Sequence, residues 1–289
     1  MLVNEDDIEA YHRDGFVVLR GVVPDEVLAS LERGVDTNMS SPSAWSNDYA
    51  GPCGGGVGAV DASDDQRGRR GRFFDDYVNW GRISEYRRAA LSGPLPRIAA
   101  DLMGTRRPRF YHEHVLVKEP GGTASQTPWH QDDPYYGVDS DVNVSLWVPL
   151  DPVPDVVSLR ILTGSHAHGR PRFVPHRFVD DVPYVSDDAP PPGYEHLADR
   201  ASLWSDPRVA ICPANPGDVV AFHFRTLHAP GTTSADRHHG GRRRVVSFRY
   251  LGDDARWATR PWKTSPPFAD EGLVPGDVLD EGRFPIVDL

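Results

Sequence analysis

Hydrophobic positions recur at helical spacing along the first hundred residues. Helices are predicted over 5–13, 24–38, 73–80 and 83–103, with a short strand at 16–19 between the first two. Asn4 is a suitable N-cap for the first helix and Gly15 a suitable stop, while Pro24 stands where a first helical turn tolerates proline. The N-terminal part therefore looks like a helical scaffold.

The pattern changes at Phe110, after which short runs rich in valine, leucine and aromatic residues follow one another. Strands are predicted over 110–118, 142–150, 158–162, 208–212, 218–224 and 244–250. The 27 glycines and 27 prolines supply the turns between them. Helices followed by many short strands predict a mostly β fold with flanking helices.

Residues 40–72 fit neither pattern. This stretch is rich in Ser, Gly, Asp and Arg, so we expect a mobile loop that could serve as a lid.

The length of 289 residues predicts a single domain with a sizeable core. We divide it into the scaffold with its loop (1–109), a strand-rich core (110–252) and a C-terminal extension (253–289).

Composition and charge narrow the choice of partners. The formal net charge is −11, which repels phosphate backbones and makes a nucleic-acid partner a poor hypothesis. Only two cysteines occur, the first residues lack the pattern of a signal peptide, and no apolar run is long enough to span a bilayer. We expect a cytoplasmic protein that does not bind membranes.

The segment TPWHQDDPYY (127–136) carries the first candidate metal ligands. His130 and Asp132 are two apart, and in a strand such residues face the same side. His228 follows the apolar segment GDVVAFHF; His223 within that segment is a rival but is more simply a core or wall residue. Two histidines and one carboxylate leave coordination positions open, which is typical of iron(II) oxygenases that bind a keto acid and dioxygen.

A cationic candidate lies fifteen residues after His228. Strand alternation in RRRVVSFRY places Arg243 and Ser247 on one face and Arg244 on the other. A buried guanidinium at Arg243 could bind the far carboxylate of 2-oxoglutarate at two points. If the register is off by one, Arg244 takes this place.

Several ordered segments resemble the phytanoyl-CoA dioxygenase family of iron(II)- and 2-oxoglutarate-dependent oxygenases. They are YHRDGFVVLRGVVPDEVLASL, HVLVKEPGG with TPWHQDDPYY, SLWVPLDPV, ILTGSH, GDVVAFHFRTLHAPG and RRRVVSFRY. The resemblance implies a double-stranded β-helix (jelly-roll, cupin-like) core with Fe(II) held by His130, Asp132 and His228.

The same resemblance assigns residues around the co-substrate. It places the 2-oxoglutarate arginine at Arg243 with Ser247, a tryptophan beside the co-substrate at Trp147 and a pocket residue at Thr127. Further candidates for the substrate side of the pocket are Lys118, Trp129, Tyr135 and Tyr136. In this family Ala229-Pro230 would more often be Gly-Ser.

The expected activity is hydroxylation of an unactivated C–H bond in a small molecule, with dioxygen consumed and succinate and carbon dioxide released. The substrate class stays open among secondary metabolites, amino acids and acyl compounds, as does the oligomeric state. Asp132 favours hydroxylation over halogenation; desaturation, cyclisation and epimerisation are alternatives. The residues are also compatible with a non-catalytic jelly-roll binding protein, or with a zinc or manganese isomerase that would not need Arg243.

Overall fold

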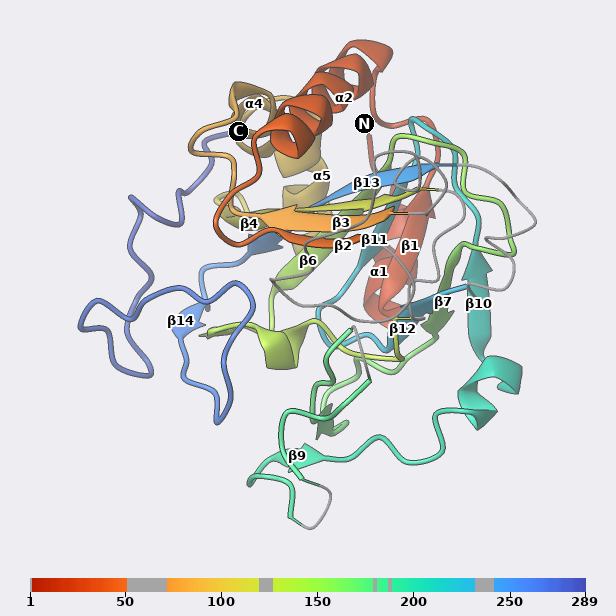
Figure 1. Cartoon of the computed structure of the whole chain (residues 1–289), viewed down its shortest axis with the longest axis vertical. Helices are drawn as coiled ribbons and strands as arrows, with labels where there is room; N and C mark the ends of the chain where they lie inside the picture. The colour runs from red at the N-terminus through yellow and green to blue at the C-terminus, as the bar shows by residue number, and fades with distance from the viewer. Residues whose placement is uncertain (1, 51–71, 120–126, 179–180, 187–188, 232–241) are drawn as a thin grey trace.

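Two antiparallel sheets form the framework of the protein, with helices against the outer face of the larger one (Figure 1). The computed structural model describes residues 2–50, 72–119, 127–178, 181–186, 189–231 and 242–289. Within these ranges no helix is both long and apolar enough to cross a membrane.

The large sheet has seven strands. In spatial order they are β1 (Phe16–Leu19), β11 (Val219–Phe222), β6 (Asn143–Pro149), β13 (Arg243–Leu251), β4 (Arg109–Lys118), β3 (Arg72–Tyr77) and β2 (Asn47–Ala50). Neighbouring strands are antiparallel throughout. Three of these strands, β1 to β3, come from the N-terminal scaffold region, where only the strand at 16–19 is predicted, and they complete the sheet at both edges.

The small sheet contains β10 (Val209–Cys212), β7 (Leu159–Leu162) and β12 (His228–Pro230). Its Leu159 and Ile161 pack in one buried cluster with Trp147, Phe222 and Val245 of the large sheet. A jelly roll consists of two antiparallel sheets that face each other, with the chain passing from one sheet to the other. The protein has this arrangement, so the predicted fold class is confirmed. Two short pairs lie outside the sheets: β5 (Val138–Asp139) with β14 (Arg256–Trp257), and β8 (Arg172–Phe173) with β9 (Tyr194–Glu195).

The helices are α1 (Glu5–Asp14), α2 (Asp25–Ser40), α4 (Ser84–Leu91) and α5 (Pro94–Met103), with 3-10 turns η1 (Asp133–Tyr135) and η2 (Ser202–Ser205). Asn4 caps α1 as predicted: its side chain accepts from the Asp7 N–H at 2.9 Å. Gly15 ends α1 at φ 85°, a backbone angle that glycine tolerates best.

Two local predictions are wrong. The spacing of residues 73–80 predicts a helix, but most of them form β3, because this segment pairs along its length with β4. The composition of residues 40–72 predicts no regular structure, but Asn47–Ala50 form β2 against β3. The rest of the expected lid, residues 51–71, lies outside the described part of the chain.

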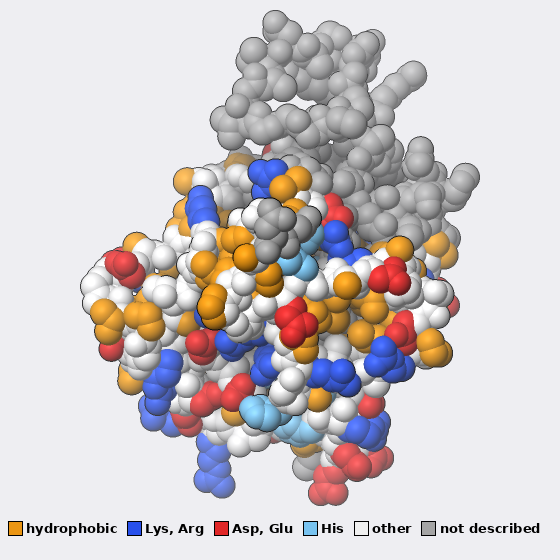
Figure 2. Space-filling view, turned by 90° about the horizontal axis from the view of Figure 1, so that it is seen from below, with side chains coloured by type: hydrophobic (Ala, Val, Ile, Leu, Met, Phe, Trp, Pro, Cys, Tyr) orange, Lys and Arg blue, Asp and Glu red, His pale blue; other side chains and the backbone are white. Residues whose placement is uncertain are grey.

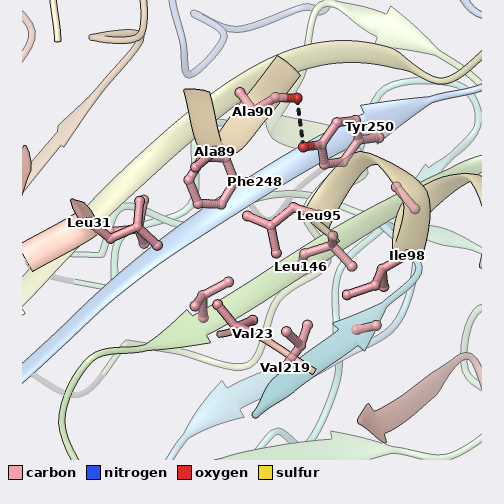
Figure 3. Packing of buried hydrophobic residues seen from close by; sticks show 14 of the residues in the cluster. Val23, Leu31, Ala89, Ala90, Leu95, Ile98, Leu146, Val219, Phe248 and Tyr250 are labelled. Carbon is pink, nitrogen blue, oxygen red and sulfur yellow. Dashed lines mark hydrogen bonds between the residues drawn. The ribbon is translucent and has the colours of Figure 1, made fainter. Parts of the chain in front are cut away.

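The outer face of the large sheet and the helices share the main hydrophobic core. Phe248 and Leu146 point toward Leu31 of α2 and Leu95 of α5, and the Tyr250 hydroxyl donates to the Ala90 carbonyl at 2.9 Å (Figure 3). Strand β13 thus turns Val246, Phe248 and Tyr250 into this core, while Arg243, Ser247 and Arg249 lie on the alternate, inner face. The helices hold the sheet from outside and leave its inner face for the site.

Charged side chains are mixed on the face seen in Figure 2. Lysine and arginine side chains lie between aspartate and glutamate around a central area of hydrophobic side chains and histidine. The net charge of −11 is therefore not concentrated in one acidic patch on this face.

We expect Phe248→Ala to lower the free energy of unfolding by about 3–5 kcal/mol, because the side chain is fully buried between sheet and helices. Urea unfolding followed by circular dichroism measures the change. Ile211→Ala, at a side chain that is 51% exposed, is the control and should change stability by about 0.5 kcal/mol or less. Equal effects of the two substitutions would contradict this assignment of the core.

Candidate metal centre and cavity

His130 and His228 are joined by a short antiparallel bridge. The His130 N–H donates to the His228 carbonyl at 3.0 Å, and the His228 N–H donates to the His130 carbonyl at 2.9 Å. His228 also begins β12 and pairs with Ile161 of β7. His130 therefore extends the edge of the small sheet, and the bridge sets the two imidazoles side by side, with ring centroids 4.2 Å apart.

The turn between α1 and β1 supports the loop before His228. The Gly15 carbonyl accepts from the His223 N–H at 2.9 Å and from the Thr226 hydroxyl at 2.8 Å. A side chain at position 15 would collide with Thr226, so glycine is required here for space as well as for its backbone angle. The N-terminal segment thus positions the distal histidine.

Backbone carbonyls orient both rings. His130 Nδ1 lies 2.8 Å from the Pro128 carbonyl, and His228 Nδ1 lies 2.9 Å from the Thr226 carbonyl. A neutral imidazole that donates from Nδ1 keeps a lone pair on Nε2, which is the usual arrangement of metal-binding histidines. Burial lowers the pKa of His130 to about 3 and also lowers the pKa of His228, so both rings are neutral at physiological pH.

Asp132 reaches the same point by a different backbone path from the one predicted. The chain does not continue as a strand after His130: Asp132 has helical angles and precedes η1. A turn, rather than strand alternation, brings its carboxylate back beside the imidazole. The next carboxylate, Asp133, points elsewhere and pairs with Arg172 at 2.7 Å.

The three side chains form a buried cluster. Asp132 Oδ1 lies 3.8 Å from Nε2 of both His130 and His228, and one ligand atom from each residue lies within 4.8 Å of the others. Burial tends to raise the pKa of Asp132, but the neighbouring Arg249 guanidinium leads the interactions that outweigh it and the pKa is lowered, so the carboxylate stays ionised. Two neutral nitrogens and one carboxylate oxygen suit a divalent transition metal and leave positions open for further ligands.

His223, the rival for the distal ligand, lies outside this cluster. Its Nε2 is 3.1 Å from the Asp141 carbonyl and 3.2 Å from Asn143 Nδ2. It is a buried residue held by hydrogen bonds, as the sequence pattern favours.

The cluster opens into a cavity of about 100 Å³ between the sheets. Its walls carry the predicted metal ligands and all but one of the other predicted site residues: Arg243, Trp147, Thr127, Ser247, Lys118, Tyr135 and Tyr136. The exception is Trp129. Its side chain packs on Trp204 at 5.3 Å between ring centroids and does not line this cavity, so its prediction as a cavity wall is wrong.

Strand alternation in β13 has the predicted register. Arg243 faces the cavity, and its Nη1 donates to the Val157 carbonyl at 2.6 Å. Arg244 faces outward, where it binds Asp151 at 2.8 Å and Glu32 of α2 at 2.7 Å. Of these two arginines, only Arg243 is placed to meet a ligand in the cavity.

Several wall residues were not singled out from the sequence. His112 and His114 lie on β4 and share a face with Lys118. Residues two or four apart in a strand face the same side, so knowing that one of the three points inward is enough to place the other two. Phe178 contacts His130 at 4.8 Å between ring centroids. Phe178 lies in a long irregular connection, where no periodicity reveals which side chains point inward.

Arg249 is the most informative of the missed residues. Alternation places it on the inner face with Arg243, and its Nη2 lies 3.5 Å from Asp132 Oδ2. The alternation in RVVSFRY already placed Arg249 on this face. It was not singled out because a charged residue at the end of a strand more often lies on the solvated surface.

Fold and site together define a jelly-roll protein with an open two-histidine, one-carboxylate metal centre in a cavity between the sheets. The sequence profile of the phytanoyl-CoA dioxygenase (PhyH) family matches residues 11–240. The chain belongs to this family. Among proteins of curated function, none matches the sequence.

Solved structures share the fold over nearly the whole chain. The alpha-ketoglutarate-dependent carbocyclase SnoK from nogalamycin biosynthesis has 21% identity and a TM-score of 0.66, covering 99% of this chain and 96% of its own. The epimerase SnoN, solved with Fe3+, alpha ketoglutarate and nogalamycin RO, has 21% identity and a TM-score of 0.70, with coverage of 98% and 97%. EctD from S. alaskensis, solved with 2-oxoglutarate and 5-hydroxyectoine, has 17% identity, a TM-score of 0.60 and coverage of 96% and 86%.

We expect Asp132→Ala to reduce bound iron from about one per chain to nearly none, because two neutral imidazoles alone hold a divalent ion weakly. Elemental analysis after anaerobic loading and gel filtration measures this. His223→Gln is the matched control and should retain the metal. Full iron occupancy in Asp132→Ala would show that the metal binds elsewhere.

Proposed function

We propose that the protein is an iron(II)- and 2-oxoglutarate-dependent dioxygenase that hydroxylates an unactivated C–H bond of a small molecule. The observation that carries the proposal is the placement of the His130, Asp132 and His228 cluster at one end of a cavity whose wall also holds Arg243. Membership of the phytanoyl-CoA dioxygenase family supports the same class of reaction.

In this proposal the inner row of β13 and its neighbours bind the co-substrate. Arg243 takes the far carboxylate in a charge-assisted pair, and Ser247, paired in register with Trp147 of β6, contacts the chain of the co-substrate. Thr127 borders the same space. Iron(II) with 2-oxoglutarate and dioxygen supplies the oxidising power, and succinate and carbon dioxide leave.

The substrate would lie on the side of the cavity formed by β3, β4 and the aromatic residues of the loops. Tyr77, Tyr135 and Phe178 give this side an apolar surface, and His114 and Lys118 add polar positions. Tyr135 is fixed in place, since its hydroxyl donates to the His176 carbonyl at 2.6 Å. A mostly apolar cavity with a few convergent polar groups is the usual form of a small-molecule site.

Cyclisation or epimerisation is the second candidate outcome. What favours it is the nature of the similar structures, which include a carbocyclase and an epimerase. Both outcomes begin with hydrogen removal and use the same metal-binding residues. Product analysis distinguishes them, because only hydroxylation adds an oxygen atom to the substrate.

Succinate formation tests the proposed class of enzyme. With iron(II), 2-oxoglutarate and dioxygen, we expect the wild-type protein to release succinate and Arg243→Ala to need a far higher 2-oxoglutarate concentration. The lost charge-assisted pair is worth about 2–5 kcal/mol in a partly desolvated site. The measurement is the KM for 2-oxoglutarate, followed by succinate release.

Arg244→Ala is the matched control, because the neighbouring arginine faces away from the cavity. It should leave the KM nearly unchanged. A protein that loads iron but makes no succinate would favour the non-catalytic binding protein, and an effect confined to Arg244→Ala would contradict the assignment of Arg243.

A further inference from the structure

Arg249 is a fully buried cation that the proposed co-substrate site does not use. It lies on β13, six residues after Arg243 and on the same inner face, and its side chain lines the cavity. Only 5% of the residue is exposed. A guanidinium keeps its charge at any physiological pH, so this burial requires partners.

Two of the three guanidinium nitrogens have partners. Nε donates to the Tyr136 hydroxyl, and Nη2 lies 3.5 Å from Asp132 Oδ2. Nη1 is buried and has no hydrogen-bond partner among the described residues. His112, the cross-strand partner of Arg249, also has a buried Nδ1 without one in the same part of the chain.

A buried charged donor without an acceptor is costly, so these atoms point to an acceptor supplied by a ligand. Its position is restricted, because Nη1 and Nη2 share one carbon and Nη2 faces Asp132. An acceptor at Nη1 therefore lies beside the metal ligand, at the opposite end of the inner row from Arg243.

Charge identifies the acceptor. In the proposed function a keto acid binds next to Asp132, so two carboxylates crowd around one divalent ion. A guanidinium between them attracts both and reduces their repulsion, and the effect is strong in a buried site. His112 stays neutral beside Arg249, since burial and then Arg249 hold its pKa well below the usual value, so it can add a hydrogen bond without a second charge.

We propose that Arg249 is a second carboxylate-binding residue of the cavity. Its Nη1 donates to the carboxylate adjacent to the keto group of 2-oxoglutarate, while Nη2 holds Asp132. Arg243 and Arg249 then bind the two ends of one dicarboxylate. This assignment rests on the proposed function and adds a residue to it.

Binding of a one-ended keto acid tests the assignment. Pyruvate has the keto-acid end of 2-oxoglutarate but lacks the far carboxylate. The binding of pyruvate should therefore depend on Arg249 and not on Arg243. Calorimetric titrations under argon, on protein saturated with iron(II), give the affinity of each variant for pyruvate and for 2-oxoglutarate. The iron content of each variant is measured first.

We expect Arg249→Gln to weaken both pyruvate and 2-oxoglutarate about tenfold or more, the loss typical of a hydrogen bond to a charged group. Arg249→Lys keeps a charge but not the planar fork, so its loss should be smaller. Arg243→Gln, the matched variant on the same strand face, should weaken 2-oxoglutarate alone. Thermal melting identifies variants that fail to fold. If Arg249→Gln fails to fold, the conservative variant Arg249→Lys is measured in its place.

Two results would overturn the inference and leave the proposed function intact. The first is an iron-loaded Arg249→Gln or Arg249→Lys that binds pyruvate as tightly as the wild type. The second is loss of iron affinity alone, with normal keto-acid binding once iron is saturating, which would make Arg249 a partner of Asp132 only. If iron-loaded wild-type protein binds neither keto acid, the proposed function itself fails.

Discussion

The backbone bridge between His130 and His228 is the interaction on which the site depends. Each residue donates to and accepts from the other, which ties the loop after β4 to the start of β12 although they are far apart in the sequence. The carbonyls of Pro128 and Thr226, each two residues before its histidine, then set the direction of the rings. Sheet hydrogen bonds thus place the metal-binding atoms, and the helices outside only need to hold the sheet.

The charged side chains of the cavity occupy distinct positions on the inner face of β13 and beside it. Arg243 and Arg249 supply positive charge at two positions on one strand, and Asp132 supplies negative charge beside the neutral His130 and His228. Arg249, Asp132 and the two histidines are buried and Arg243 is half-buried, so their fields are screened by water less than those of surface charges. The protein therefore holds, before any ligand enters, a charge pattern that suits a metal ion and a dicarboxylate.

Much of this arrangement could be predicted from the sequence because period-two alternation is strong where a strand has an apolar outer face. In β13, Val246 and Phe248 enter the core, so Arg243 and Ser247 must face the opposite way. The prediction failed where tertiary pairing overrides local spacing: residues 73–80 have helical spacing, but most of them form β3 because they pair with β4. Trp129 was misplaced because it lies in an irregular segment, where alternation gives no direction, and it packs on Trp204 outside the cavity.

The central claim is that the metal and the co-substrate share one site, with the metal providing part of the binding surface for 2-oxoglutarate. The most direct test is to titrate 2-oxoglutarate into metal-free and iron(II)-loaded protein under argon and compare the heats of binding. The account predicts binding of about one molecule per chain to the iron-loaded protein and much weaker binding to the metal-free protein. Equal affinity in the two forms, or no binding to the iron-loaded form, would contradict it.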